Sequence, residues 1–349
     1  MIRKEHDKGI IEYILKNNNG TTVKLINVGC SITEILVPDK DGKYSNVVLR
    51  YKTLEEYFRN EHFLGSVIAP VAGRLENAEL TIDDEVYSFN PNEGQNLLHS
   101  GELNPYNKIW DSSIEDDKIV FQYKMDDEYP GSPLFKVICS LSEDNELKLE
   151  YEVSAESESA VAPTNHTYFN LGSEDTRNHL VRSNTESYLK MNEELISESA
   201  EKCEGLFDLK NGRLFSDVFA ADDEQIEIAN GGFDHYFIFE KDDKSVNITD
   251  KKSGRTMKVT TTFPGMVLYT GNNLDESVVL KDRKAQKYAG FCVETQCLPA
   301  ALKLLPDQEI SIDKKNTYKK KQYSVLVQID RKNRVCSNFE QTLFFLINY

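Results

Sequence analysis

Short segments of alternating or β-branched and aromatic residues dominate the hydrophobic pattern of the chain. Such segments predict β-strands. Turn-forming residues separate them at short intervals, as in NNNG at 17–20, DKDG at 39–42 and KKSG at 251–254. The predicted strands cover residues 10–16, 21–28, 31–39, 118–125, 135–142, 146–155, 235–240, 256–263 and 322–329.

Helical periodicity is scarce. The clearest instance is TLEEYF at 53–58, where Thr53 and Glu56 fit a capping box and predict one short helix or turn. Many short strands without alternating helices favour an all-β fold, in which antiparallel sheets pack as a sandwich.

The chain shows no linker-like composition and no internal repeat, so residues 1–330 are expected to form a single β-sandwich domain. Residues 331–349 differ in character and are expected to be a C-terminal extension of unknown role. Their apolar run at 343–347 is too short to span a bilayer. An edge strand, a packed terminus and a partner-binding segment all fit it.

The charge balance narrows the range of partners. The 349 residues contain 41 Lys and Arg against 58 Asp and Glu, for a formal charge of −17. Such a chain repels phosphate backbones and anionic lipids, so neither nucleic acid nor membrane is expected as a partner. The N-terminus carries recurrent charges and no apolar secretory segment. Six scattered cysteines without a CxxC pair indicate reduced thiols, which suits a cytoplasmic protein better than a disulfide framework or a zinc site.

Common catalytic signatures are missing from the sequence, among them GxGxxG, the Walker A loop, HExxH and GxSxG. The first remaining candidate is PTNHTYFNLG at 163–172. Along a strand, His166, Tyr168 and Asn170 would point to one side. A histidine in that setting can transfer protons, although the local pattern alone favours a hydrogen-bonded core histidine.

The second candidate is GFCVETQCLP at 290–299, where Glu294 lies in an otherwise apolar segment and shares a side with Cys292 and Gln296. Partial burial would raise the pKa of this carboxyl toward neutrality and make it a serviceable general base. A structural ion pair is the alternative.

Three further residues are weaker candidates when each is considered alone. Asp234 opens an aromatic strand in GGFDHYFIFE at 231–240, where aspartate is disfavoured unless it lies at an edge or has a function. His99 precedes a Ser-Gly turn, and Arg74 follows an apolar stretch. An acid, a base, a carboxylate, a guanidinium and aromatic rings on a β-sandwich together suit a carbohydrate, whose hydroxyls need polar partners and whose C–H face stacks on rings.

At these segments the sequence resembles the aldose 1-epimerase (galactose mutarotase) family, from the N-terminal strands to about residue 330. PTNHTYFNLG is the most specific match. GGFDHYF, PGMVLYTGNNL at 264–274 and GFCVETQ follow in the family's order.

The resemblance implies a large antiparallel β-supersandwich of the galactose mutarotase type and an isomerase that interconverts the α and β anomers of free aldohexoses such as glucose and galactose. Glu294 would be the general base and His166 the general acid, with His99 assisting at the ring oxygen. Asp234 and Arg74 would bind sugar hydroxyls. The family uses no metal or organic cofactor, so none is expected here.

The sequence departs from the family pattern at the edges of these motifs. Gly73 stands where the family usually has an asparagine, LHSG replaces the usual Leu-His-Gly-Gly, and NPYN at 104–107 replaces a Gly-Phe-Asp segment. CLPAALK at 297–303 lacks the usual Pro-Asp pair. These changes concern specificity more than chemistry.

Three other functions remain open on the sequence: an epimerase of a phosphorylated hexose, a glycoside hydrolase that uses Asp234 and Glu294 as its carboxylate pair, and a non-catalytic sugar-binding protein. The expected partner is a small aldose, and the expected assembly is a monomer or a weak homodimer.

Overall fold

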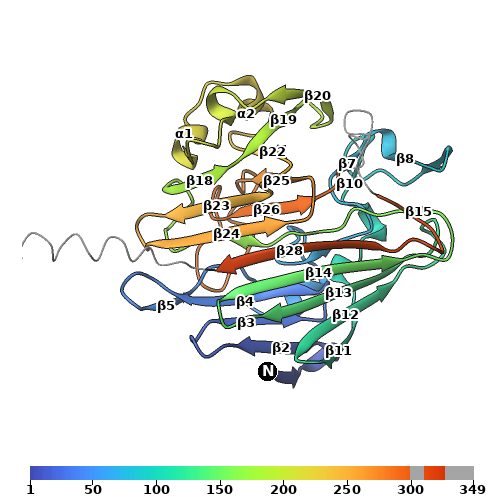
Figure 1. Cartoon of the computed structure of the whole chain (residues 1–349), viewed down its shortest axis with the longest axis horizontal. Coiled ribbons are helices and arrows are strands. Elements are labelled where there is room, and N and C mark those ends of the chain that lie inside the picture. The colour runs from blue at the N-terminus through green and yellow to red at the C-terminus, as the bar shows by residue number, and fades with distance from the viewer. Residues whose placement is uncertain (299–309, 327–349) are drawn as a thin grey trace, which may run out of the picture.

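The computed structural model describes residues 1–298 and 310–326 (Figure 1). Strands make up most of its regular structure, and they pair antiparallel throughout the three larger sheets. Within this part of the chain, α-helix is confined to α1 (Phe215–Phe219) and α2 (Glu224–Ile228). The predicted all-β class with few short helices is therefore confirmed.

The largest sheet has nine strands, and its central members are the long strands that the alternation pattern predicts. Along β13 and β14, buried residues alternate with half-buried ones, so one side of the sheet faces the core. In order across the sheet, the strands are β11 (Asp111–Glu115), β12 (Lys118–Lys124), β13 (Leu134–Leu141), β14 (Glu146–Ser154), β28 (Tyr318–Leu326), β24 (Arg255–Thr261), β23 (Ser245–Asp250), β18 (His179–Ser183) and β21 (Arg213–Leu214).

Two further sheets and several short ladders complete the architecture. The six-stranded sheet runs in the order β17 (Tyr168–Phe169), β26 (Phe291–Gln296), β25 (Gly265–Tyr269), β22 (Asp234–Phe239), β19 (Thr185–Met191) and β20 (Ser197–Lys202). The five-stranded sheet contains β1 (Ile2–Glu5), β2 (Ile11–Lys16), β3 (Thr22–Ile26), β4 (Ser31–Pro38) and β5 (Tyr44–Asn46). Two-stranded ladders join β6 (Val67–Ile68) to β16 (Thr164–Asn165), β7 (Arg74–Leu75) to β10 (Leu97–Leu98), β8 (Glu79–Ile82) to β9 (Glu85–Ser88) and β15 (Ser159–Ala160) to β27 (Ser311–Ile312).

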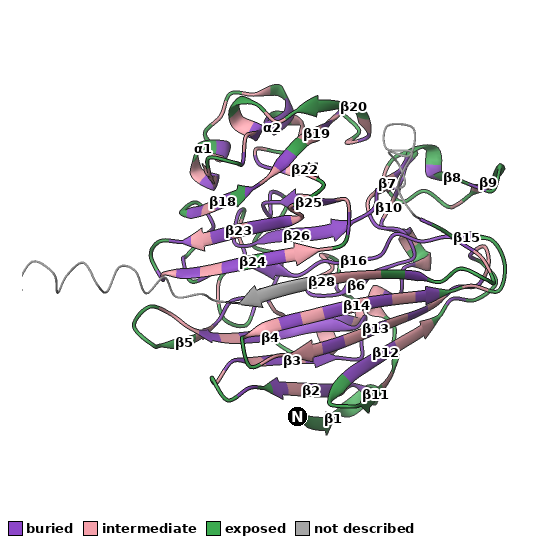
Figure 2. Ribbon diagram, in the orientation of Figure 1, coloured by how far each residue is buried: buried purple, intermediate pink, exposed green. Residues whose placement is uncertain are grey.

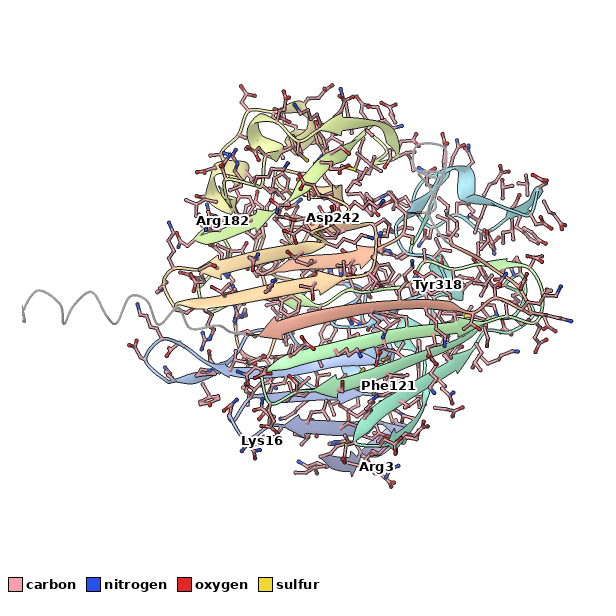
Figure 3. The ribbon with its side chains drawn as sticks, viewed as in Figure 1. Arg3, Lys16, Phe121, Arg182, Asp242 and Tyr318 are labelled. Carbon is pink, nitrogen blue, oxygen red and sulfur yellow. The ribbon has the colours of Figure 1, made fainter. Side chains whose placement is uncertain are left out.

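One large hydrophobic cluster draws side chains from all three sheets, including Val23, Phe135 and Phe237. Figure 2 shows the buried and half-buried positions alternating along the strands. Figure 3 labels Phe121 on β12, which is fully buried, and the exposed Arg3 and Lys16 near the edge of the view. Burial of this apolar surface is the main force that holds the sheets together.

A buried arginine adds a polar link between sheets. Arg255, at the start of β24, donates hydrogen bonds to the carbonyls of Leu171 (2.8 Å) and Val37 (3.1 Å) and to Ser45 Oγ (2.8 Å). The nine-stranded sheet is thereby joined to β4 and β5, and the buried guanidinium keeps its partners.

The pattern-based strands match β2, β3, β4, β12, β13, β14, β22 and β24 to within a few residues. The ninth matches β28, although its residues 327–329 lie outside the described part. The segment 53–58 forms a 3-10 turn (Glu55–Phe58), and the Glu56 carboxylate accepts hydrogen bonds from the Thr53 N–H and hydroxyl. The extension 331–349 also lies outside the described residues.

The prediction of one continuous strand at 163–172 is wrong. The chain forms β16 and β17 with His166 and Thr167 between them. At this interruption the His166 N–H bonds to the Ser66 carbonyl, and the Asn165 side chain bonds to the Gly65 carbonyl. Asn170 comes just after the end of β17, so strand alternation does not place it beside His166. Its side chain instead accepts hydrogen bonds from the N–H groups of residues 172 and 173.

None of the helices in the described part of the chain is both long and apolar enough to cross a membrane.

Candidate active site

All five residues predicted for the site line one pocket, of about 220 Å³. They are Arg74, His99, His166, Asp234 and Glu294, which come from distant parts of the sequence. Sites for drug-sized ligands typically enclose about 300–1,000 Å³, so this pocket suits a smaller molecule.

The six-stranded sheet forms one wall of the pocket. Across neighbouring strands, Glu294 on β26 lies opposite Val267 on β25, and Val267 lies opposite Tyr236 on β22. All three line the pocket, as does Asp234 two residues before Tyr236 on the same side of its strand. Antiparallel register therefore places the two carboxylates on one surface.

A short ladder and the turn after it form another part of the wall. Arg74 on β7 pairs with Leu98 on β10, and His99 follows directly. His99 has a positive φ of 51° and is held by the backbone of Gly73: its N–H donates to the Gly73 carbonyl (2.9 Å), and its Nδ1 accepts from the Gly73 N–H (3.1 Å). Since Nδ1 accepts, the hydrogen of the neutral ring must be on Nε2.

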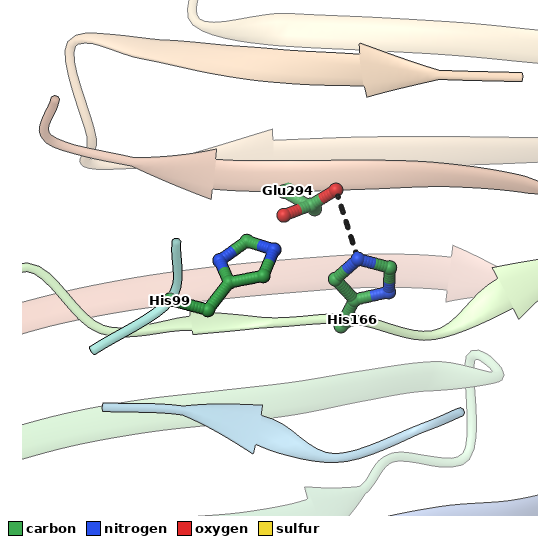
Figure 4. Close-up of side chains that lie close together, drawn as sticks. All are labelled: His99, His166 and Glu294. Carbon is green, nitrogen blue, oxygen red and sulfur yellow. Dashed lines mark ion pairs between the residues drawn. The ribbon is translucent and has the colours of Figure 1, made fainter. Parts of the chain in front are cut away.

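Glu294 and His166 form a buried pair, with Glu294 Oε1 at 3.6 Å from His166 Nε2 (Figure 4). Burial and the Asp234 carboxylate raise the pKa of Glu294 well above its usual range, although Arg74 acts against this shift. Burial lowers the pKa of His166 to about 4. Both shifts disfavour charge, so burial favours the neutral form of the free pair, with its one proton on the carboxyl group.

The second ring nitrogen of His166 also has a neighbour. Cys292, which lies two residues before Glu294 on β26, places its Sγ at 3.5 Å from His166 Nδ1. Burial raises the pKa of this thiol well above its usual range, so it stays protonated. Both ring nitrogens of His166 therefore have a neighbour that positions the imidazole.

Arg74 lies between two carboxylates. Its Nε and Nη2 donate to the two oxygens of Glu93 (2.5 and 3.0 Å), and its Nη1 lies 3.8 Å from Asp234 Oδ2. Burial lowers the pKa of Arg74, but Asp234 and Glu93 outweigh burial and raise it overall. Burial raises the pKa of Asp234, against the effect of Arg74. The bidentate contact fixes the plane of the guanidinium.

Several pocket residues carry no motif and are missed by the sequence analysis. Phe63 packs edge-on against His99 (ring centroids 5.0 Å apart) and contacts His166 (5.7 Å), although its φ is positive at 58°. Glu61 and His62 line the pocket beside it. Glu93 could have been suspected only from its position six residues before His99.

The three donor groups of His99, His166 and Glu294 lie within 4.8 Å of one another, a spacing that a metal ion could use. The hydrogen-bonding argues against a fit. His99 Nδ1 already accepts from the Gly73 N–H, so Nε2 carries the hydrogen and offers no lone pair to a metal.

Together, the sandwich fold and the buried Glu-His pair define a class of protein: a β-sandwich with an acid–base site for a small polar molecule.

Comparison with known proteins identifies the family. The family model for aldose 1-epimerase matches residues 12–323. Galactose mutarotase from Sus scrofa is 32% identical over 306 residues, which cover 84% of this chain and 87% of that protein. Aldose 1-epimerase from Escherichia coli (strain K12) is 29% identical over 297 residues, covering 82% and 85%.

Solved structures agree on the fold. A galactose 1-epimerase from Lactobacillus acidophilus NCFM has a TM-score of 0.82 at 26% identity and covers 93% of this chain and 97% of that one. A GalM/aldose epimerase homologue from C. elegans has a TM-score of 0.84 at 22% identity, with 91% and 99% covered. The chain belongs to the aldose 1-epimerase family, and its fold is the supersandwich that the resemblance implies.

Removal of the Glu93 carboxylate should leave the Arg74 guanidinium less firmly oriented. In Glu93→Gln we expect KM for the sugar to rise about threefold to tenfold, with a smaller change in kcat, because a bidentate contact with a carboxylate becomes a single hydrogen bond to a neutral amide oxygen. Steady-state polarimetry measures both constants. Glu85→Gln removes the same charge from an exposed glutamate and serves as the control. Equal KM values in the two variants would show that Glu93 does not position Arg74.

Proposed function

We propose that this protein is a mutarotase, which interconverts the α and β anomers of free aldohexoses such as glucose and galactose. The observation that supports this function best is the buried contact between Glu294 and His166. Ring opening must remove a proton from the anomeric hydroxyl and add one to the ring oxygen. Both oxygens are bonded to the same carbon, so the base and the acid must lie side by side, as these two groups do.

Glu294, as carboxylate, accepts the proton of the anomeric hydroxyl, and a C=O double bond forms at C1. The bond from C1 to the ring oxygen breaks, and the ring oxygen takes a proton from the His166 imidazolium. Rotation about C1–C2 exposes the other side of the aldehyde. The same two proton transfers in reverse close the ring as the opposite anomer, and a positioned acid or base contributes about 10²–10⁴-fold in rate.

The proton count of the pair matches this sequence. The closed sugar requires a carboxylate and an imidazolium, whereas the open chain leaves a neutral carboxyl and a neutral imidazole. Both states contain one proton. The free pocket favours the neutral arrangement because burial disfavours charge on either group. The protein environment therefore favours the protonation state that accompanies the open-chain sugar.

His99 has a different role from His166. Burial, His166 and Arg74 lower its pKa well below the usual range, so it stays neutral and offers its Nε2–H as a hydrogen-bond donor. Such a donor suits the ring oxygen as charge develops there. Arg74 and Asp234 hold hydroxyls of the sugar and so orient the anomeric carbon.

The alternatives fit the pocket less well. A phosphorylated hexose needs unpaired cations, yet Arg74 is the one Lys or Arg among the described residues that line the pocket, and it already faces two carboxylates. A glycoside hydrolase gives no task to His166. A sugar-binding protein without catalysis needs no buried acid–base pair.

We further propose that the protein is cytoplasmic and acts as a monomer or weak homodimer. Its exposed large hydrophobic residues in the described part, among them Tyr44, Val86 and Val279, are scattered along the chain. Sedimentation equilibrium would test the assembly: a tight oligomer at micromolar concentration contradicts it.

Polarimetry tests the activity directly. Freshly dissolved α-D-glucose and α-D-galactose should change optical rotation faster with the protein than in buffer, and prior treatment with EDTA should leave that rate unchanged. A decay at the buffer rate with both sugars contradicts the proposal.

The base can be tested by Glu294→Gln. Glutamine keeps the size of the side chain but cannot accept the anomeric proton, so turnover should fall roughly 10²-fold or more while sugar affinity changes little. Rate and binding are measured on the same folded sample.

Glu34→Gln is the matched control, because Glu34 is also buried but forms structural ion pairs with Lys24 and Arg50. This variant should lose stability and keep its turnover per folded molecule. Near-normal turnover in Glu294→Gln would mean that another group is the base.

A further inference from the structure

Gln296 has an unusual environment for a buried amide. Its side chain is fully buried and lines the pocket, yet neither Oε1 nor Nε2 has a hydrogen-bond partner in the described part of the chain. Other buried polar atoms without partners occur among these residues, such as Tyr57 Oη and His235 Nε2, but they belong to residues that do not line the pocket.

A buried carboxamide without partners destabilises a folded protein, since its lost hydration is not replaced. Such a group lowers the stability of the fold unless a ligand supplies the missing hydrogen bonds. The carboxamide offers one acceptor and two donors, and a sugar hydroxyl both donates and accepts. Gln296 is thus chemically complementary to a hydroxyl group.

The register of β26 places Gln296 relative to the proposed base. It lies two residues after Glu294 on the same side of the strand, which separates the two side chains by roughly 6.6 Å. That separation is too large for both side chains to bond to oxygens on the same carbon. It is comparable with the width of a sugar ring. With Glu294 at the anomeric hydroxyl, Gln296 faces the far side of the ring.

Gly73 leaves space beside this amide. A Cβ at position 73 would lie 2.9 Å from Leu298 Cδ1 and 3.6 Å from Gln296 Nε2, so a side chain there would crowd the same corner. Gly73 itself lines the pocket and has a φ of 82°. The absence of a side chain at position 73 therefore leaves room beside the amide for a substituent of the substrate.

We propose that Gln296 is a substrate-binding residue that selects aldoses with a hydroxyl at C3 or C4, the hydroxyl-bearing ring carbons farthest from the anomeric carbon, through the space over Gly73. This inference rests on the proposed mutarotase function and adds a determinant of substrate choice to it.

The test compares wild type with Gln296→Leu on D-glucose, D-galactose and their 2-, 3- and 4-deoxy analogues, with kcat/KM measured by polarimetry. In wild type, removal of the 3- or 4-hydroxyl should lower kcat/KM roughly tenfold or more, because the amide is again left unpaired. In Gln296→Leu, that penalty should shrink by about the same factor for one of these two analogues. The 2-deoxy analogue should show the same penalty in both proteins.

Thermal unfolding without sugar separates binding from structure. Gln296→Leu removes two unpaired buried polar atoms and should be at least as stable as wild type. Asn46→Leu is the control, because the Asn46 amide is buried and fully engaged, with bonds to Ile35 N and Val48 O; it should lose stability and keep the wild-type pattern among sugars. Gln296→Met repeats the test with a more adaptable side chain.

Equal deoxy-sugar penalties in wild type and Gln296→Leu would overturn the inference, and so would a clear loss of stability in both Gln296 variants. A wild-type protein that leaves every sugar at the buffer rate contradicts the proposed function instead. Equilibrium binding of the same sugars to both proteins would then decide the role of Gln296 alone.

Discussion

Burial of a carboxyl group next to an imidazole is the constraint on which the rest of the site depends. In water, Glu294 would be charged at neutral pH and His166 would titrate independently. In the pocket, burial shifts the two pKa values in opposite directions, so the pair behaves as one unit that holds one proton. A unit of this kind can give and take protons at two neighbouring oxygens without a net change in charge.

The sheets provide this environment and its rigidity. Glu294 lies in a strand whose six residues are all buried, with β25 on one side and β17 on the other. Cys292 on that strand also contacts His166. The backbone of Gly73 holds His99 at both its N–H and its ring. Each of the proposed catalytic groups is therefore oriented by neighbours that have no proposed part in the reaction, which is the condition for precise positioning.

Much of the fold follows from local pattern, and much of the site does not. Strands such as β13 and β14 alternate so regularly that sequence alone locates them. Where the chain is interrupted between β16 and β17, it bonds to residues 65 and 66, about a hundred positions away, and no local pattern contains these partners. Glu294 stands out because it is charged within an apolar segment.

Arg74 and His99 are weak signals alone and were identified through the family resemblance. Glu93 and Phe63 lie in loops without a motif, so only the three-dimensional arrangement reveals their contacts with Arg74 and His99. Strand alternation places Gln296 on the same side as Glu294, but its lack of hydrogen-bond partners is visible only once the surrounding atoms are placed.

The pH dependence of kcat/KM, corrected for the buffer rate, tests the shared proton most directly. Below a pH of about 4, the pair takes up a second proton, which binds to His166 while Glu294 remains protonated. The base is then lost and the rate falls. On the alkaline side the rate should fall at a pH well above the ordinary glutamate range, where Glu294 loses its proton and the acid is lost. A broad plateau between these two limits agrees with one proton held by a buried pair. Independent, solvated groups would instead give a narrow profile, with an acid limb near the ordinary glutamate value of about 4.3 and an alkaline limb near the ordinary histidine value of about 6.5. Such a profile contradicts the account.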